Sequence, residues 1–123
     1  MLVELGTLAA TQSIETDNTK QAVNYLLDYC ATNQDSKFIF HSSEMKLRIH
    51  SNASYLSQSQ ARSFTGGKLF LGTKLFNVTR EYNGAILTLS KIMKNVISST
   101  EVAEVGALFH NTKSGEPIRA TLD

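Results

Sequence analysis

The chain has 123 residues, of which 41% are hydrophobic and 19% are charged, and its formal net charge is +1. The length suits one domain with a modest core, and the composition is too apolar for wholesale disorder. No apolar run approaches the roughly 20 residues of a membrane-spanning helix, and the near-neutral charge argues neither for nor against a nucleic-acid partner.

Two helices are expected near the N-terminus. Residues 2–10 have apolar side chains at helical spacing, although Gly6 weakens the pattern. A polar stretch separates them from a second helix at residues 19–32, which Asp17 or Asn18 would cap. One face of this second helix carries an apolar stripe at i, i+3, i+4 and i+7, formed by Val23, Leu26, Leu27 and Cys30.

Cys30 is the single cysteine of the chain and lies in that apolar stripe. Its expected role is that of a small buried hydrophobe rather than a reactive thiol. One cysteine cannot form an internal disulfide, and the first residues lack the basic start of a signal peptide. We therefore expect an intracellular location, cytoplasmic or nuclear.

The period of the apolar residues changes from 3.6 to 2 after residue 36, so a helical segment at 1–36 is expected to precede a separate domain at 37–123. The domain opens with a short apolar run at 37–40. A polar turn follows, and residues 45–54 then alternate between apolar and polar side chains. This alternation predicts a half-buried strand.

Two further strands are expected after a polar loop at 56–60. Residues 62–72 form the first, and its glycine pair at 66–67 predicts a bulge or a bend. The Asn-Gly pair at 83–84 is a turn signal, and residues 85–92 form the next strand. The three strands are expected to pair as an antiparallel meander.

The last expected element is a helix. Ser98 and Glu101 fit a capping box at its start, and Gly115 and Pro117 are expected to interrupt it. Strands in a meander that are then covered by a helix indicate an α+β fold. The apolar face of this helix would consist of Val102, Val105, Leu108 and Phe109.

Several segments together resemble a known family. L-R-I-H-S-N-A-S-Y at 47–55 and S-S-T-E-V-A-E-V-G-A-L at 98–108 are similar to the ribonuclease H portion of copia-type retrotransposon polyproteins. There, a strand ending in S-D-A-D/S opens the domain, and a helix carrying S-S-x-E-A-E-x-x-A-L follows the third strand. R-S-F-T-G-G and L-F-L-G within 62–72 resemble the second strand of that family. N-Y-L-L-D-Y at 24–29 is similar to the helix that joins the reverse-transcriptase thumb to the ribonuclease H domain.

The resemblance implies a partial ribonuclease H-like fold. Residues 1–36 would correspond to the thumb or connection of the reverse transcriptase, and residues 37–123 to a truncated ribonuclease H-like domain. In the family, a fourth strand pairs parallel with the first. That strand and a fifth are missing here, so the first strand is expected to keep an open edge through which copies of the chain self-associate.

The resemblance also implies the chemistry of a site. Family members hydrolyse the RNA strand of RNA–DNA hybrids with two Mg²⁺ ions held by four carboxylates. Asn52 stands where the family has the first-strand aspartate, Glu104 matches the helix carboxylate, and the other two carboxylates would lie beyond residue 123. The alternative interpretations are a polar strand-end residue for Asn52 and a solvated helix glutamate for Glu104. We therefore expect no catalysis by the chain as it stands and no bound cofactor, with Mg²⁺ only in an active form.

Other side chains give weaker indications. The three histidines include no pair at the spacing of zinc ligands. Five basic residues would line a hybrid-binding face or form an ordinary solvated surface: Lys68, Lys74, Arg80, Lys91 and Lys94.

Three functions stand as hypotheses. The first is a catalytically inactive remnant of a retroelement reverse transcriptase/ribonuclease H region, with at most weak binding of an RNA–DNA hybrid. The second is an active ribonuclease H completed by another chain, against which Asn52 argues. The third is a repurposed protein-interaction module that accepts a strand at the open sheet edge.

Overall fold

The computed structural model describes residues 2–11, 16–73 and 83–122. The chain forms two compact units, Met1–Lys37 and Phe38–Asp123. The α+β class is confirmed, since the described residues form three α-helices and a three-stranded antiparallel sheet whose strands lie in chain order. None of the described helices is long and apolar enough to cross a membrane.

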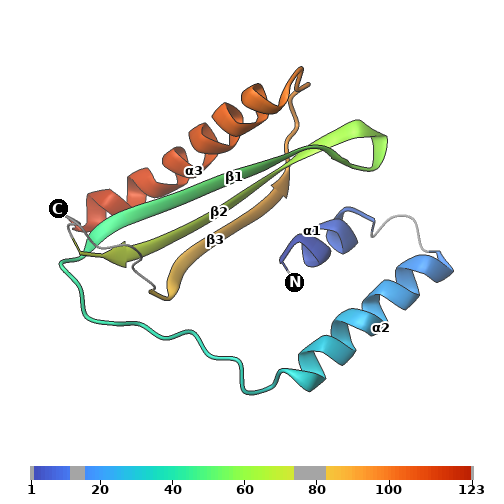
Figure 1. Cartoon of the computed structure of the whole chain (residues 1–123), viewed down its shortest axis with the longest axis horizontal. Helices are drawn as coiled ribbons and strands as arrows, with labels where there is room; N and C mark the ends of the chain where they lie inside the picture. The colour runs from blue at the N-terminus through green and yellow to red at the C-terminus, as the bar shows by residue number, and fades with distance from the viewer. Residues whose placement is uncertain (1, 12–15, 74–82, 123) are drawn as a thin grey trace. The chain divides into compact units, whose positions relative to one another are not determined.

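The first unit contains α1, Leu2–Ala10, and α2, Asp17–Thr32 (Figure 1). The helix at 2–10 is confirmed. The expected cap of the second helix is wrong by one or two residues, because Thr16 precedes the first turn and its Oγ1 accepts the N–H of Thr19 at 3.2 Å.

The expected burial of the α2 stripe is wrong. Cys30 is exposed, and no described residue of α2 is buried. Part of α2 also extends beyond α1, since nine residues of α1 span about 14 Å, whereas the sixteen residues of α2 span about 24 Å. The shorter helix therefore cannot cover the longer one. An apolar groove of about 520 Å³ lies between the two helices and is lined partly by Tyr25 and Tyr29.

The second unit is built on a sheet of β1, Lys46–Gln58, β2, Arg62–Gly72, and β3, Ala85–Ile92 (Figure 1). The expected bounds of the second and third strands are confirmed. The expected loop at 56–60 is wrong, because β1 continues to Gln58 and a single 3₁₀ turn, η1, Ser59–Ala61, joins it to β2. This tight connection requires positive φ angles at Gln60 and Ala61, a conformation that non-glycine residues rarely adopt.

Asn83 attaches the segment that precedes β1, at His41, to the end of β2. It is buried, its Oδ1 accepts the N–H of His41 at 2.9 Å, and its Nδ2 donates to the carbonyl oxygens of His41 and Leu71. The neighbouring Gly84 donates its N–H to the Ile39 carbonyl at 2.8 Å. A Cβ at Gly84 would lie 2.8 Å from a ring carbon of Phe40, so this close approach requires glycine. The Asn-Gly pair therefore ties two distant segments together.

The third helix, α3, Thr100–Leu122, lies along one face of the sheet and contacts β1 and β2 (Figure 1). Its expected apolar face is wrong. The side chains predicted to be buried are exposed, from 45% for Val102 to 67% for Val105. The stripe that faces the sheet repeats every four residues and consists of Ala103, Ala107, Asn111 and Gly115.

The small residues of that stripe allow α3 to approach the sheet backbone closely. A Cβ at Gly67 would lie 1.6 Å from Oδ1 of Asn111, and a Cβ at Gly115 would lie 2.8 Å from the Ile49 side chain. The expected bulge at 66–67 is also wrong, because both glycines pair in regular register with β1 and β3. These glycines provide room for the helix.

The expected interruption of the last helix is wrong as well. Helix α3 runs through Gly115 and Pro117 to Leu122. Gly115 is buried, and a Cβ there would lie 2.8 Å from the Ile49 side chain and 3.4 Å from that of Leu69. This packing fixes the helical turn that precedes the proline, so tertiary contact outweighs the helix-breaking tendency of the two residues.

Candidate functional site at the end of β1

The start of α3 is fixed by a serine cap and by a tyrosine from β1. Ser99 accepts the Val102 N–H on its Oγ at 3.3 Å, so the cap lies one residue later than the expected Ser98. A hydrogen bond between the Ser99 hydroxyl and the Glu101 carboxylate lowers the pKa of that carboxyl. The Tyr55 hydroxyl donates to the Ser98 carbonyl at 3.1 Å. The first turn of the helix is thereby attached to the distal part of β1.

These contacts bring Glu104 against β1. Its half-buried carboxylate accepts the backbone N–H of Ala53 on Oε1 at 3.3 Å. Ala53 directly follows Asn52, and the two pair with Thr65 and Gly66 of β2. The helix residue and the strand position that the sequence singled out therefore belong to neighbouring parts of the structure.

The side chains of Asn52 and Glu104 do not meet on one face of the sheet. Ser51 bonds to Asn111 of α3 through its Oγ, so Ser51 faces the helix. Successive residues of a regular strand project to opposite faces, and the pairing is regular from Lys46 to Ser54. Asn52 consequently projects away from α3, while Glu104 approaches from the α3 side.

The described residues do not fit the two-magnesium site that the resemblance implies. They contain no group of three or more His, Cys, Asp or Glu side chains that could hold a metal ion. One oxygen of Glu104 is already engaged by a backbone N–H, and Asn52 is a neutral side chain on the other face. One carboxylate is too few for a divalent cation that is usually held by several oxygen ligands.

Sequence reasoning missed Asn111, which joins α3 to both neighbouring strands. Its side chain is fully buried, and Nδ2 donates to Ser51 Oγ at 3.1 Å, to the Gly66 carbonyl at 3.0 Å and to the Ala107 carbonyl at 2.8 Å. Asn111 lies two helical turns beyond Glu104, and its hydrogen bonds fix the position of α3 along its own axis relative to the sheet. The four-residue repeat of small side chains in the helix was the available signal.

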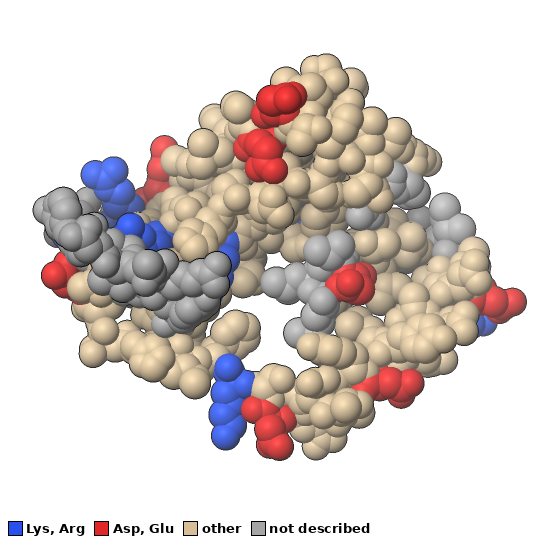
Figure 2. Space-filling view, in the orientation of Figure 1, with Lys and Arg blue, Asp and Glu red and all other residues tan. Residues whose placement is uncertain are grey.

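Sequence reasoning also missed how the charges are distributed. The three strands contain Lys46, Arg48, Arg62, Lys68 and Lys91 but no Asp or Glu. The acidic residues of α3 are Glu101, Glu104 and Glu116. In Figure 2, acidic side chains lie over the helix at the top of the view. Because all the acidic residues of the chain lie outside β1, β2 and β3, the net charge of +1 does not reveal that the strands are basic.

The basic residues named from the sequence do not form one face. Lys68 and Lys91 lie on opposite faces of the sheet, because they pair with Thr88 and Thr65 in regular register. Lys94 follows β3 and lines a separate groove at the end of the sheet. Lys74 and Arg80 lie outside the described residues.

No family model, no curated protein and no solved structure matches the chain.

Proposed function

We propose that the chain is a catalytically inactive remnant of the ribonuclease H region of a copia-type retroelement, whose family hydrolyses RNA in RNA–DNA hybrids. The observation that carries the proposal is the contact between Glu104 and Ala53, next to Asn52. This contact occurs in the element order that the family resemblance implies, an antiparallel meander followed by a helix. The segment N-Y-L-L-D-Y, which resembles the helix that precedes the ribonuclease H domain in the family, lies in α2, ahead of that unit in the chain.

The inactivity follows from charge. At an effective dielectric constant of 20, two unit charges 4 Å apart attract by about 4 kcal/mol, and a divalent ion roughly doubles this value. Asn52 offers a neutral carbonyl oxygen where the family has an aspartate. Losing even half of the attraction weakens metal binding about a thousandfold, at about 1.4 kcal/mol per factor of ten. In addition, Asn52 projects away from α3, so its side chain and that of Glu104 are not placed to hold the same metal ion.

The experiment is cleavage of a labelled RNA–DNA hybrid in the presence of Mg²⁺ and then Mn²⁺. It compares the natural chain with Asn52→Asp and with Glu104→Ala, and a melting curve of each variant reports whether it folds. We expect no cleavage by any of the three, because Glu104 is the single described residue that matches a family carboxylate, and Asn52→Asp would restore only one more of the four. Cleavage by the natural chain that disappears in Glu104→Ala would show an active site completed by another copy.

A further inference from the structure

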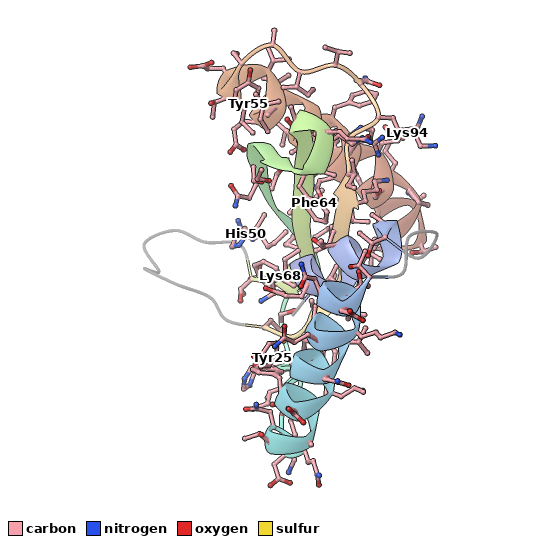
Figure 3. All side chains as sticks on the ribbon, turned by 90° about the vertical axis from the view of Figure 1, so that its right-hand side faces the viewer. Tyr25, His50, Tyr55, Phe64, Lys68 and Lys94 are labelled. Atoms are coloured by element: carbon pink, nitrogen blue, oxygen red, sulfur yellow. The ribbon has the colours of Figure 1, made fainter. Side chains whose placement is uncertain are left out.

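One face of the sheet carries a row of basic side chains. Leu47 and Ile49 face α3, because a Cβ added at Gly115 would lie 3.5 Å from the Leu47 side chain and 2.8 Å from that of Ile49. The alternate residues of β1, which are Lys46, Arg48 and His50, therefore project to the opposite face. Lys68 of β2 pairs with His50 and lies on this same face (Figure 3). We call the four residues Lys46, Arg48, His50 and Lys68 the basic face.

Two of these side chains rest on an aromatic ring. Phe70 is only 3% exposed, the His50 ring meets it edge-on with centroids 5.0 Å apart, and Lys68 Nζ lies 5.0 Å from its centroid. Such a cation–aromatic contact holds the ammonium group close to the sheet. In addition, Arg48 donates from Nη2 to the Thr73 carbonyl. These contacts restrict the side chains and reduce the entropy lost when they bind a ligand.

The sheet offers the basic face no acidic partner, since the strands contain no Asp or Glu. Like charges held on neighbouring strands repel each other, and a polyanion relieves that repulsion. Alternate residues of one strand are about 6.8 Å apart, so β1 presents its row at regular intervals. A linear ligand with one negative charge per repeat unit matches this arrangement, and an extended nucleic-acid strand is such a ligand.

We infer that the basic face binds single-stranded nucleic acid through its phosphate backbone. The exposed imidazole of His50 provides a flat ring beside which a base can stack. An acidic peptide would satisfy the charges but would leave this ring unused, which is why nucleic acid is favoured. The inference extends the proposed function, and it rests on that function for the choice of nucleic acid as the class of ligand. It places binding on the sheet face away from α3, whereas Glu104 approaches from the α3 side.

The test is fluorescence polarisation of a labelled oligothymidylate of about 12 nucleotides, within the usual range of single-strand site sizes, titrated with the full chain. Lys46→Gln and Lys68→Gln each remove one charge and keep most of the side-chain stem. At about 0.1 M salt, one lost phosphate contact weakens single-strand binding about fivefold, and the double variant about 25-fold. The slope of log K against log salt should become shallower by about 0.7 for each charge removed.

Lys91→Gln is the matched control, because Lys91 is an exposed lysine of the same sheet on the opposite face. It should leave the affinity within about twofold of the natural chain, and thermal melting should show that all variants fold. Equal weakening by Lys91→Gln, or no binding by the natural chain at low salt, overturns the inference. Competition by polyglutamate as strong as that by unlabelled oligothymidylate assigns the face to acidic peptides and also overturns it.

The cleavage experiment and the binding experiment can each contradict one proposal while leaving the other intact. Hybrid cleavage by the natural chain would contradict the proposed inactivity without affecting the location of the binding face. Unchanged binding in the Lys46→Gln and Lys68→Gln double variant would reject the basic face without affecting the assignment of Glu104 and Asn52.

Discussion

At the scale of single residues, Gly67 and Asn111 determine how closely α3 approaches the sheet. The Asn111 side chain fills the space above Gly67, and its Nδ2 shares two N–H donors among three acceptors, one from β1, one from β2 and one from its own helix. A buried amide with several partners specifies one position along a helix, whereas apolar contacts tolerate sliding. The contact between Glu104 and Ala53 depends on that position.

Replacing Gly67 by alanine tests this role. The added Cβ would lie 1.6 Å from Asn111 Oδ1, so the amide must move and its hydrogen bonds must break or lengthen. We expect Gly67→Ala to lower the free energy of unfolding by about 3 kcal/mol, measured by urea denaturation.

Gly66→Ala is the matched control for that substitution. A Cβ at Gly66 meets nothing closer than the Asn52 carbonyl oxygen at 3.8 Å, an ordinary van der Waals distance. Its effect should stay below about 1 kcal/mol. Equal destabilisation by the two alanine substitutions would show that glycine is needed at both positions for backbone reasons unrelated to the helix.

At the scale of elements, the positions of helices and strands were largely predictable, but the buried faces of the helices were not. Alternation located the start of β1, while apolar residues that follow a polar loop or an Asn-Gly turn signal located β2 and β3. The face of α3 was misjudged because hydrophobicity alone was used. Here the stripe of small residues packs against a glycine-containing strand, and close backbone approach replaces bulky side chains.

The candidate site was predictable only through family resemblance. Neither the spacing of Glu104 in its helix nor the position of Asn52 in its strand distinguishes them from solvated polar residues. The basic face was not predictable from the net charge, because all the acidic residues of the chain lie outside β1, β2 and β3 and together offset the strand lysines and arginines. A count of charges by element, combined with the alternation of β1, would have found it.

Two substitutions in α3 distinguish its two faces. Ala107 is fully buried against the sheet, so Ala107→Leu adds three carbons where no space exists and should cost about 2–3 kcal/mol of unfolding free energy. Phe109 is 62% exposed, so Phe109→Ser should change stability by less than about 1 kcal/mol. Thermal and urea unfolding of both variants provide the measurement. The reverse order of effects would show that the apolar stripe of α3 is its buried face.

At the scale of the whole molecule, the side chains whose burial the structure describes are buried in only one of the two units. All described residues that are buried, including Phe64, Leu69 and Met93 in the core, lie in the unit Phe38–Asp123. In the unit Met1–Lys37, residues 4–11 and 16–37 include none. Burial of apolar surface is the main favourable term in folding, so the two units differ in their capacity to fold independently.

This difference predicts how the separated units behave. A fragment of residues 38–123 should retain β-structure by circular dichroism and unfold in one cooperative transition, because it contains the whole described core. A peptide of residues 1–37 should be largely unfolded in water, since helices of nine and sixteen residues are near or below the length at which isolated helices are stable. A fragment of residues 38–123 that stays unfolded while the full chain melts cooperatively would show that the helical unit contributes stability that the core of the second unit cannot supply. A folded 1–37 peptide would show instead that the groove between α1 and α2 closes into a core of its own.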